Sequence, residues 1–202
     1  MEKIINYKIK EFFNIQDYKL LIDYLSILDN LNPLKQVMNP KYKWYKIKQS
    51  KTIKIPSILE LTFGEVTEIR NSFGNSDIES IIESVMMLTK LKRIEVLNFT
   101  IIQFYGIISS IKADLIQIQN MEFNELSNDE DDINIELTNA NERMSKYGIV
   151  NVFDNLSNGD ITKWNEIEKI PYLTVFTKLS MDNTKAKIQK EISELQKKQM
   201  KK

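Results

Sequence analysis

Apolar residues recur between Leu97 and Ile118 at the spacing of an α-helix that packs along one face. The steps between them are four, three, four, three, four and three residues, for Leu97, Ile101, Phe104, Ile108, Ile111, Leu115 and Ile118. This rhythm keeps one seam of a helix turned toward a partner helix. Four more apolar residues widen the seam, namely Ile102, Tyr105, Ile107 and Ile116. The wider face favours burial in a helical bundle over a free two-stranded coiled coil. We therefore predict a central core helix that begins near Arg93.

The same stretch holds the longest charge-free run of the chain, residues 96–111, which Lys112 ends. A bilayer span needs about 20 mostly apolar residues. This run is shorter and is interrupted by Asn98, Gln103 and two serines. We expect a core helix and no membrane segment.

Further helices are predicted on the N-terminal side of this stretch. Residues 17–29 carry leucines and a tyrosine at helical spacing. Thr62 to Glu65 fits a capping box, in which a hydroxyl and a carboxylate satisfy free backbone N–H groups, and a helix to about residue 72 follows. Ser76 to Glu79 repeats this pattern before a helix over 77–91.

The C-terminal side also reads as helical. Residues 133–147 repeat the four-three spacing and Gly148 offers a left-handed stop, so we expect this helix to fold back antiparallel on the central one. Asp160 is suited to cap a short helix that ends before Pro171. Pro171 is suited to the first position of the next helix.

Residues 183–202 predict a lysine-rich helix with only a thin apolar stripe, formed by Ile188, Ile192 and Leu195. A helix with so little apolar surface is marginally stable alone. We expect it to dock on another chain or to fray, and we take the stripe as a candidate interaction surface.

The N-terminal quarter has a different pattern. Residues 4–9 alternate apolar and polar side chains, which predicts a strand. Residues 41–54 carry six lysines and no acid, and we interpret them as a basic hairpin in which Tyr45 and Ile47 face Ile53 and Ile55.

This basic segment has two interpretations. Lysines interleaved with aromatic residues suit nucleic acid, because lysines neutralise phosphates and aromatic rings stack on bases. Alternatively, the lysines protect an edge strand whose aromatic residues pack inward. The candidate contact residues are Lys43, Trp44, Tyr45, Lys46 and Lys48.

Together these patterns predict a mainly α fold: a helical bundle around a long central helix, with a small N-terminal β element. We expect three parts, namely an N-terminal strand, helix and hairpin element over 1–55, a helical bundle over 56–182, and a charged helix or tail over 183–202.

Composition removes many chemistries. The chain has no Cys and no His, which excludes thiolate catalysis, Ser-His-Asp triads and metal sites built on these residues. Lys plus Arg and Asp plus Glu both total 28, so no global field attracts nucleic acid or anionic lipid. The five glycines form no phosphate-binding loop. Residues 122–136 hold seven acids but no glycine for a calcium loop. We expect a linker there, no metal or cofactor, and no enzymatic activity.

The segment Leu61-Thr-Phe-Gly-Glu-Val66 resembles the LTFGE segment of small helical proteins of tailed bacteriophages, which include tail-assembly chaperones and neighbouring virion proteins. The ending from Gly159 to Pro171 is similar in style, and the Ile, Lys and Asn bias resembles that of crAss-like phages. Thr67 and Glu68 depart from the apolar pair expected after the motif. The resemblance carries over no functional residue.

The resemblance implies a non-enzymatic phage protein of the virion or the host cytoplasm. It would work through helix-mediated contacts in virion or tail assembly, as a structural component or an assembly chaperone. Its partners would be other phage structural or assembly proteins, or further copies of itself. The alternative is a nucleic-acid-binding or regulatory protein that uses Lys41 to Lys54. No secretion signal is evident in the first ten residues, so we expect an intracellular protein.

Overall fold

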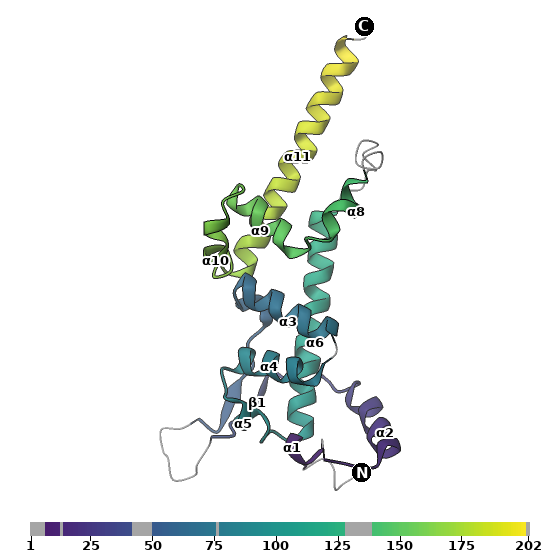
Figure 1. The fold of residues 1–202 in the computed structure, drawn as a ribbon, viewed down its shortest axis with the longest axis vertical. Helices are drawn as coiled ribbons and strands as arrows, with labels where there is room; N and C mark the ends of the chain where they lie inside the picture. Colours follow the sequence, from purple (N-terminus) through teal and green to yellow (C-terminus); the bar gives the residue numbers. More distant parts are fainter. Residues whose placement is uncertain (1–6, 13, 42–49, 76, 128–138, 201–202) are drawn as a thin grey trace. The chain divides into compact units, whose positions relative to one another are not determined.

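The fold is mainly helical, with 71% helix, a long central helix α6 (Ile101–Leu126) and a small two-stranded antiparallel sheet near the N-terminus (Figure 1). This confirms the predicted fold class. Of the 202 residues, the computed structural model describes residues 7–12, 14–41, 50–75, 77–127 and 139–200.

Contacts within the chain group it into two compact units. The first is Met1–Leu61 with Glu65–Gln117, and the second is Thr62–Gly64 with Ile118–Lys202. The boundaries expected at residues 55 and 182 each fall inside one unit, so the grouping by contact differs from the grouping by sequence pattern.

The first unit begins with α1 (Ile9–Phe12) and α2 (Tyr18–Leu28). A strand was expected over residues 4–9. Residues 4–6 lie outside the described part of the chain, Lys8 makes an isolated bridge with Thr100, and Ile9 already begins α1. The Ile9 N–H donates to the Phe99 carbonyl (3.0 Å). Among the described residues, the expected strand is thus a single bridge to the turn before α6, followed by the start of a helix.

The sheet consists of β1 (Gln36–Met38) and β2 (Thr52–Lys54). Val37 lies opposite Ile53, so the predicted hairpin is wrong in its pairing, while Tyr45 and Ile47 lie outside the described residues. Val37 is 3% exposed and is the buried residue of β1. A strand of three residues is too short for its alternation to be visible in the sequence.

Along the chain, the sheet is followed by η1 (Ile58–Glu60), α3 (Phe63–Asn75), α4 (Ile78–Thr89) and α5 (Arg93–Val96), and then by α6. The α4 cap is Asp77, whose carboxylate accepts from the Ser80 N–H (3.1 Å). The sequence predicted Ser76, one residue earlier. Asp and Ser are equally good N-caps, so residue type alone could not show which of the two caps α4.

Helix α6 buries most of the predicted seam, since Ile101, Phe104, Ile107, Ile108, Ile111 and Ile118 are at most 5% exposed. Leu115 is only half-buried and Ile116 is 59% exposed, so the seam is narrower than predicted at the later turns. The helix begins at Ile101 and not near Arg93. Thr100 caps it, because the Gln103 side chain accepts from the Thr100 N–H (3.1 Å) while the Thr100 hydroxyl accepts from the Gln103 N–H (3.4 Å). Thr-x-x-Gln is a capping box that the sequence analysis missed.

By length and composition α6 is the one helix of the described segments that could cross a membrane. Half of its most apolar window is buried inside the protein. The core helix of a folded protein has this property.

The second unit contains α8 (Ala140–Ser145), α9 (Ile149–Ser157), η2 (Ile161–Lys163), α10 (Trp164–Ile167) and α11 (Tyr172–Met200). Of the helix expected over 133–147, residues 133–138 lie outside the described residues, and α8 covers Ala140–Ser145. Met144 is 43% and Tyr147 49% exposed, so the expected burial of these two residues is wrong. The two residues have the amphipathic spacing of a helix, but no described neighbour covers their side chains.

Two local signals near the second half of this unit are confirmed. The Asp160 carboxylate caps η2 by accepting from the Thr162 N–H (3.1 Å), and the short helices end before Pro171. The Pro171 carbonyl accepts from Thr174 (3.0 Å) and Val175 (3.2 Å) at the start of α11. Proline thus precedes the helix by one residue.

Candidate interaction site

Residues 62–64, beside the start of α3, and residues 168–171, just before α11, meet in the second unit. Thr62 forms a bridge with Pro171. The Phe63 N–H donates to the Ile170 carbonyl (2.8 Å), and the Gly64 N–H donates to the Glu168 carbonyl (2.9 Å). We call residues 62–64 and 168–171 the clasp. Because it joins segments about a hundred residues apart, no local signal predicted it.

The clasp explains why glycine stands at position 64. A Cβ at Gly64 would lie 3.1 Å from the Glu168 Cβ and 3.2 Å from the Glu168 carbonyl oxygen. Such contacts are tighter than nine in ten real Cβ contacts, and the Glu168 carbonyl is already bound to the Gly64 N–H. Gly64 therefore has a structural reason that is independent of any ligand.

A row of aromatic rings backs the clasp. The Phe63 ring meets the Phe153 ring edge-on (5.4 Å between centroids) and stacks on Tyr172 (6.4 Å). Phe153 also stacks on Trp164 (6.4 Å), whose indole N–H donates to the Ser157 hydroxyl (3.2 Å). These contacts fix the N-terminal end of α11.

One side of α11 is then bound along the C-terminal turns of α6 and the residue after them. The Tyr172 hydroxyl donates to the Glu122 carboxylate (2.9 Å). Three further bonds follow at Ser180 to Glu125 (3.0 Å), Asn183 to the Glu125 carbonyl (2.8 Å) and Lys187 to the Ser127 carbonyl (3.2 Å). We call this side of α11 the bound face.

Another side of α11 carries exposed apolar residues. Ile188 is 50%, Ile192 45% and Leu195 59% exposed, and Met181, seven residues before Ile188, is 51% exposed. With 3.6 residues per turn, these four lie about 130° around the axis from the bound face. We call them the α11 stripe.

The last part of α11 is exposed on every side. From Ile188 to Met200 each residue except Ser193 is exposed. Figure 1 shows that this part continues α11 without a break. The predicted C-terminal helix is thus the end of a 29-residue helix, and the predicted stripe residues Ile188, Ile192 and Leu195 lie together on it. Met181 was missed, although its spacing of seven from Ile188 was a usable signal.

The basic segment is described only at its two ends. Lys43, Trp44, Tyr45, Lys46 and Lys48 lie outside the described residues, so their role stays a prediction. Asn39 holds both ends together: its carboxamide oxygen accepts from the Lys41 N–H (2.9 Å), and its carboxamide nitrogen donates to the Ser50 carbonyl (3.0 Å).

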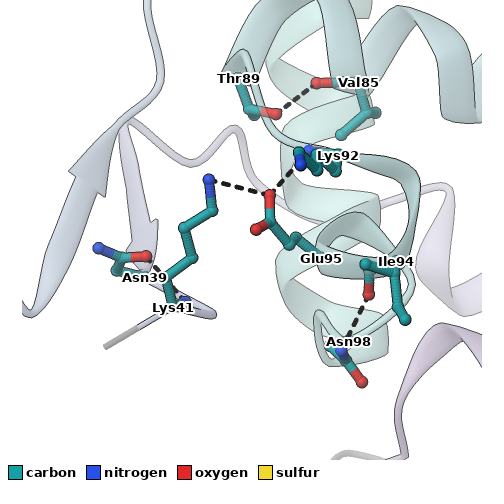
Figure 2. Close-up of polar contacts among 8 residues, drawn as sticks. All are labelled: Asn39, Lys41, Val85, Thr89, Lys92, Ile94, Glu95 and Asn98. Carbon is teal, nitrogen blue, oxygen red and sulfur yellow. Dashed lines mark hydrogen bonds and ion pairs between the residues drawn. The ribbon is translucent and has the colours of Figure 1, made fainter. Parts of the chain in front are cut away.

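Lys41 itself is tied to α5. Figure 2 shows the Lys41 ammonium and the Lys92 backbone N–H converging on one oxygen of Glu95, at 3.0 Å and 2.8 Å. Burial raises the pKa of the Glu95 carboxyl, but the Lys92 N–H and the Lys41 charge outweigh it and hold the pKa below its ordinary value. Lys41 therefore serves a structural ion pair.

The other two carboxyls with a lowered pKa, those of Asp77 and Asp160, cap helices. Hydrogen bonds from Ser80 lower the pKa of Asp77, and bonds from Thr162 and Lys163 lower that of Asp160. Burial, with the nearby Asp29 charge, raises the pKa of Tyr105 to about 12. Across the described ranges, no three His, Cys, Asp or Glu side chains are grouped so that they could hold a metal ion.

Comparison with known proteins adds no relative: no family model, no curated protein and no solved structure matches the chain.

Proposed function

We propose that this chain is a non-enzymatic protein that acts through helix-mediated protein–protein contacts, with the α11 stripe as a contact surface. One observation carries the proposal. Three large aliphatic side chains, Ile188, Ile192 and Leu195, are each about half exposed on a stretch that is open on nearly all sides. Covering the exposed part of each would contribute on the order of 1 kcal/mol.

The energetics of isolated helices support this proposal. A short helical end without tertiary contacts is marginally stable in water. A partner that covers the stripe would stabilise both the helix and the complex. Segments that are weakly stabilised by their own chain are suited to order on a partner.

The biological setting that we propose rests on the phage-like segments Leu61–Val66 and Gly159–Pro171. In this setting the chain takes part in virion or tail assembly of a tailed bacteriophage, as a structural component or as an assembly chaperone. Its partners are other phage structural or assembly proteins, or further copies of the chain. In the clasp, both segments make backbone contacts that stabilise the fold. The resemblance therefore supports a fold shared with the phage proteins, and it assigns no binding residue.

Quantitative mass spectrometry of purified virions tests this setting. Several copies per particle would identify a structural component. Absence from particles, together with a complex with a virion protein in infected cells, would identify a chaperone. Absence from both would contradict the proposal.

A pair of variants tests the contact surface. Ile188→Asp with Ile192→Asp places two carboxylates in the stripe and should abolish incorporation or complex formation. Glu194→Gln lies about 130° from the stripe on the same exposed helix and should leave both unchanged. Equal behaviour of the two variants would contradict a role for the stripe.

Nucleic-acid binding through Lys41 to Lys54 remains the second candidate. Of its described lysines, Lys41 is paired with Glu95, and Lys54 lies 4.0 Å from Glu60. Lys51 is described and exposed, so any binding would depend on it together with three lysines outside the described residues, Lys43, Lys46 and Lys48. If this candidate holds, affinity for DNA or RNA falls steeply with salt and is lost when these three lysines become Glu. No binding at low salt would remove it.

A further inference from the structure

We propose that the α11 stripe is the contact surface for a second copy of this chain, with the exposed ends of the two α11 helices packed antiparallel. This inference rests on the proposed function and deepens it, because it names the occupant of the stripe. Three features of α11 carry it: the spacing of the stripe, the balance of the charges beside it, and the position of Lys185.

The spacing of the stripe is that of a coiled-coil seam. Steps of seven, four and three residues separate Met181, Ile188, Ile192 and Leu195. In heptad terms Ile192 occupies one core position, and the other three residues occupy the second. A narrow seam of this kind fits the same kind of seam on another helix.

Most lysines of the exposed end of α11 lie away from the stripe. In the heptad register of the stripe, the positions opposite the seam carry three of them, namely Lys187, Lys190 and Lys197. Their charges would remain in water when the stripe is covered. They neither select the occupant of the stripe nor oppose a second copy.

The charges that do lie in or beside the seam cancel. They are two acids and two lysines: Asp182, Lys185, Glu191 and Lys198. A two-fold interface sets one patch against an identical patch, so a residue i that contacts j of the copy is matched by j contacting i. A patch with paired charges of both signs can satisfy itself in this way, whereas it offers no preference to a partner of one sign.

Glu191 and Lys198 select the register of the pair. If Ile192 packs opposite Leu195 of the copy, Glu191 lies about 3 Å along the helix axis from Lys198 of the copy, on the same side of the seam. Side chains tilt toward the N-terminus of their own helix, so in antiparallel helices these two tilt toward each other. Both are exposed in the single chain, and the symmetry forms the ion pair twice.

Other arrangements of two copies bring like charges together. A parallel in-register pair sets Lys185 beside Lys185 of the copy inside the seam, which is destabilising. An antiparallel pair shifted by seven residues sets Glu191 about 3 Å along the axis from Glu191 of the copy. In the proposed register the C-terminal end of the copy reaches only to Lys185, so this ammonium stays in water at the rim of the pair.

The proposed interface is small. Its apolar centre consists of three side chains from each copy, Ile188, Ile192 and Leu195, each about half exposed before association. Stable complexes use roughly 20–30 residues on each side. We therefore expect a reversible dimer that forms at high protein concentration, such as the local concentration within an assembly.

Sedimentation of the full-length chain between about 10 µM and about 1 mM tests the proposal. The wild type should associate, and Ile188→Asp with Ile192→Asp should abolish association. Glu191→Lys and Lys198→Glu should each weaken it by about three- to tenfold, because each sets like charges opposite each other twice. The combined variant restores opposite charges and should associate as the wild type does.

Two matched controls carry the same charge changes away from the seam. Glu194→Lys and Lys197→Glu should leave association unchanged. Zero-length carbodiimide crosslinking of a mixture of isotopically light and heavy chains should join Glu191 of one chain to Lys198 of another, as read by mass spectrometry.

Three results would overturn the inference: a monomer at about 1 mM, association that ignores the Ile188 and Ile192 changes, or a combined variant that associates no better than the single ones. Vesicles of phosphatidylcholine with phosphatidylserine test a membrane surface as the occupant, and binding to them through the stripe without self-association would also overturn it. These failures are separable from failure of the proposed function. If the chain is found in virions or assembly complexes but stays monomeric alone, only the identity of the partner is wrong.

Discussion

Gly106 lies where another segment of the first unit crosses helix α6 at close range. The Leu34 N–H donates to the Gly106 carbonyl (3.1 Å), and the Ser110 hydroxyl donates to the Leu34 carbonyl (2.8 Å). A Cβ at position 106 would lie 2.4 Å from Leu34 Cδ1 and 2.5 Å from its Cγ. Because both bonds hold the Leu34 backbone beside α6, the clash can be relieved only if the Leu34 side chain leaves its present conformation.

Gly106→Ala should therefore destabilise the protein by about 1–3 kcal/mol, the usual cost of overpacking. Helix propensity alone would give the opposite sign, a gain of up to about 1 kcal/mol. Gly74→Ala in α3, where a Cβ meets nothing within 4 Å, is the matched control and should be neutral or stabilising. Urea unfolding measures both, and an unchanged Gly106→Ala protein would contradict the close crossing.

The Glu95 carboxyl should make stability depend on pH. Its pKa is lower in the folded protein than its ordinary value of 4.5, so its stabilisation is present above that value and is lost as pH falls through the lowered pKa. Glu95→Gln should reduce the stability at pH 7 by at most about 1 kcal/mol, as for other partly exposed pairs. At pH values below the lowered pKa, the two proteins should unfold alike.

Thermal unfolding of the wild type and of Glu95→Gln, at pH 7 and at a pH below the lowered pKa of Glu95, measures this difference. Glu83→Gln is the control, because Glu83 is an exposed glutamate of α4 with no ion-pair partner among the described residues. A Glu95→Gln effect that persists at low pH would show that the loss does not come from the charge.

Helix α6 shows how one element divides between core and surface. Ile108 is 5% exposed, whereas Ile116, two turns further along the same helix, is 59% exposed. Both are apolar and both were assigned to the broad seam from the sequence. Tyr105 lies at nearly the same angle around the helix axis as Ile116 and is 6% exposed. The same side of α6 is therefore covered near Tyr105, whereas at Ile116 it is an open face.

Ile108→Asp should unfold the first unit or make the chain insoluble, because an unpaired carboxylate in a packed seam costs several kcal/mol. Ile116→Asp, the same change on the open face, should shift stability by less than about 0.5 kcal/mol. Circular dichroism with thermal melting compares them. Equal melting of Ile108→Asp and wild type would contradict the core role of the seam.

At the scale of the whole chain, the end of α11 adds exposed surface and little stability. Removing residues 188–202 should leave the melting temperature within about 2 °C of the wild type, because nearly all of these residues are exposed. Val175→Asp, at a position 3% exposed near the start of α11, should by contrast unfold the second unit. A large destabilisation by the truncation would mean that this segment packs on its own chain.

The sequence by itself determined the features that depend on a few neighbouring residues. The seam of α6, the Asp160 cap and the start of α11 beside Pro171 follow from helical periodicity and from hydrogen bonds within one turn. The exposed residues Ile188, Ile192 and Leu195 were also identified in this way, because too few apolar residues accompany them to bury the helix. These signals are local, so they do not depend on how the rest of the chain folds.

Only the tertiary structure decided which distant segments meet. Val37 pairs with Ile53, residues 62–64 form the clasp with residues 168–171, and the amphipathic face with Met144 and Tyr147 stays exposed. Spacing shows that a residue suits a buried position but does not name the residue that covers it. Long-range pairing depends on the shape and free backbone groups of both segments, which the order of residues in either one does not contain.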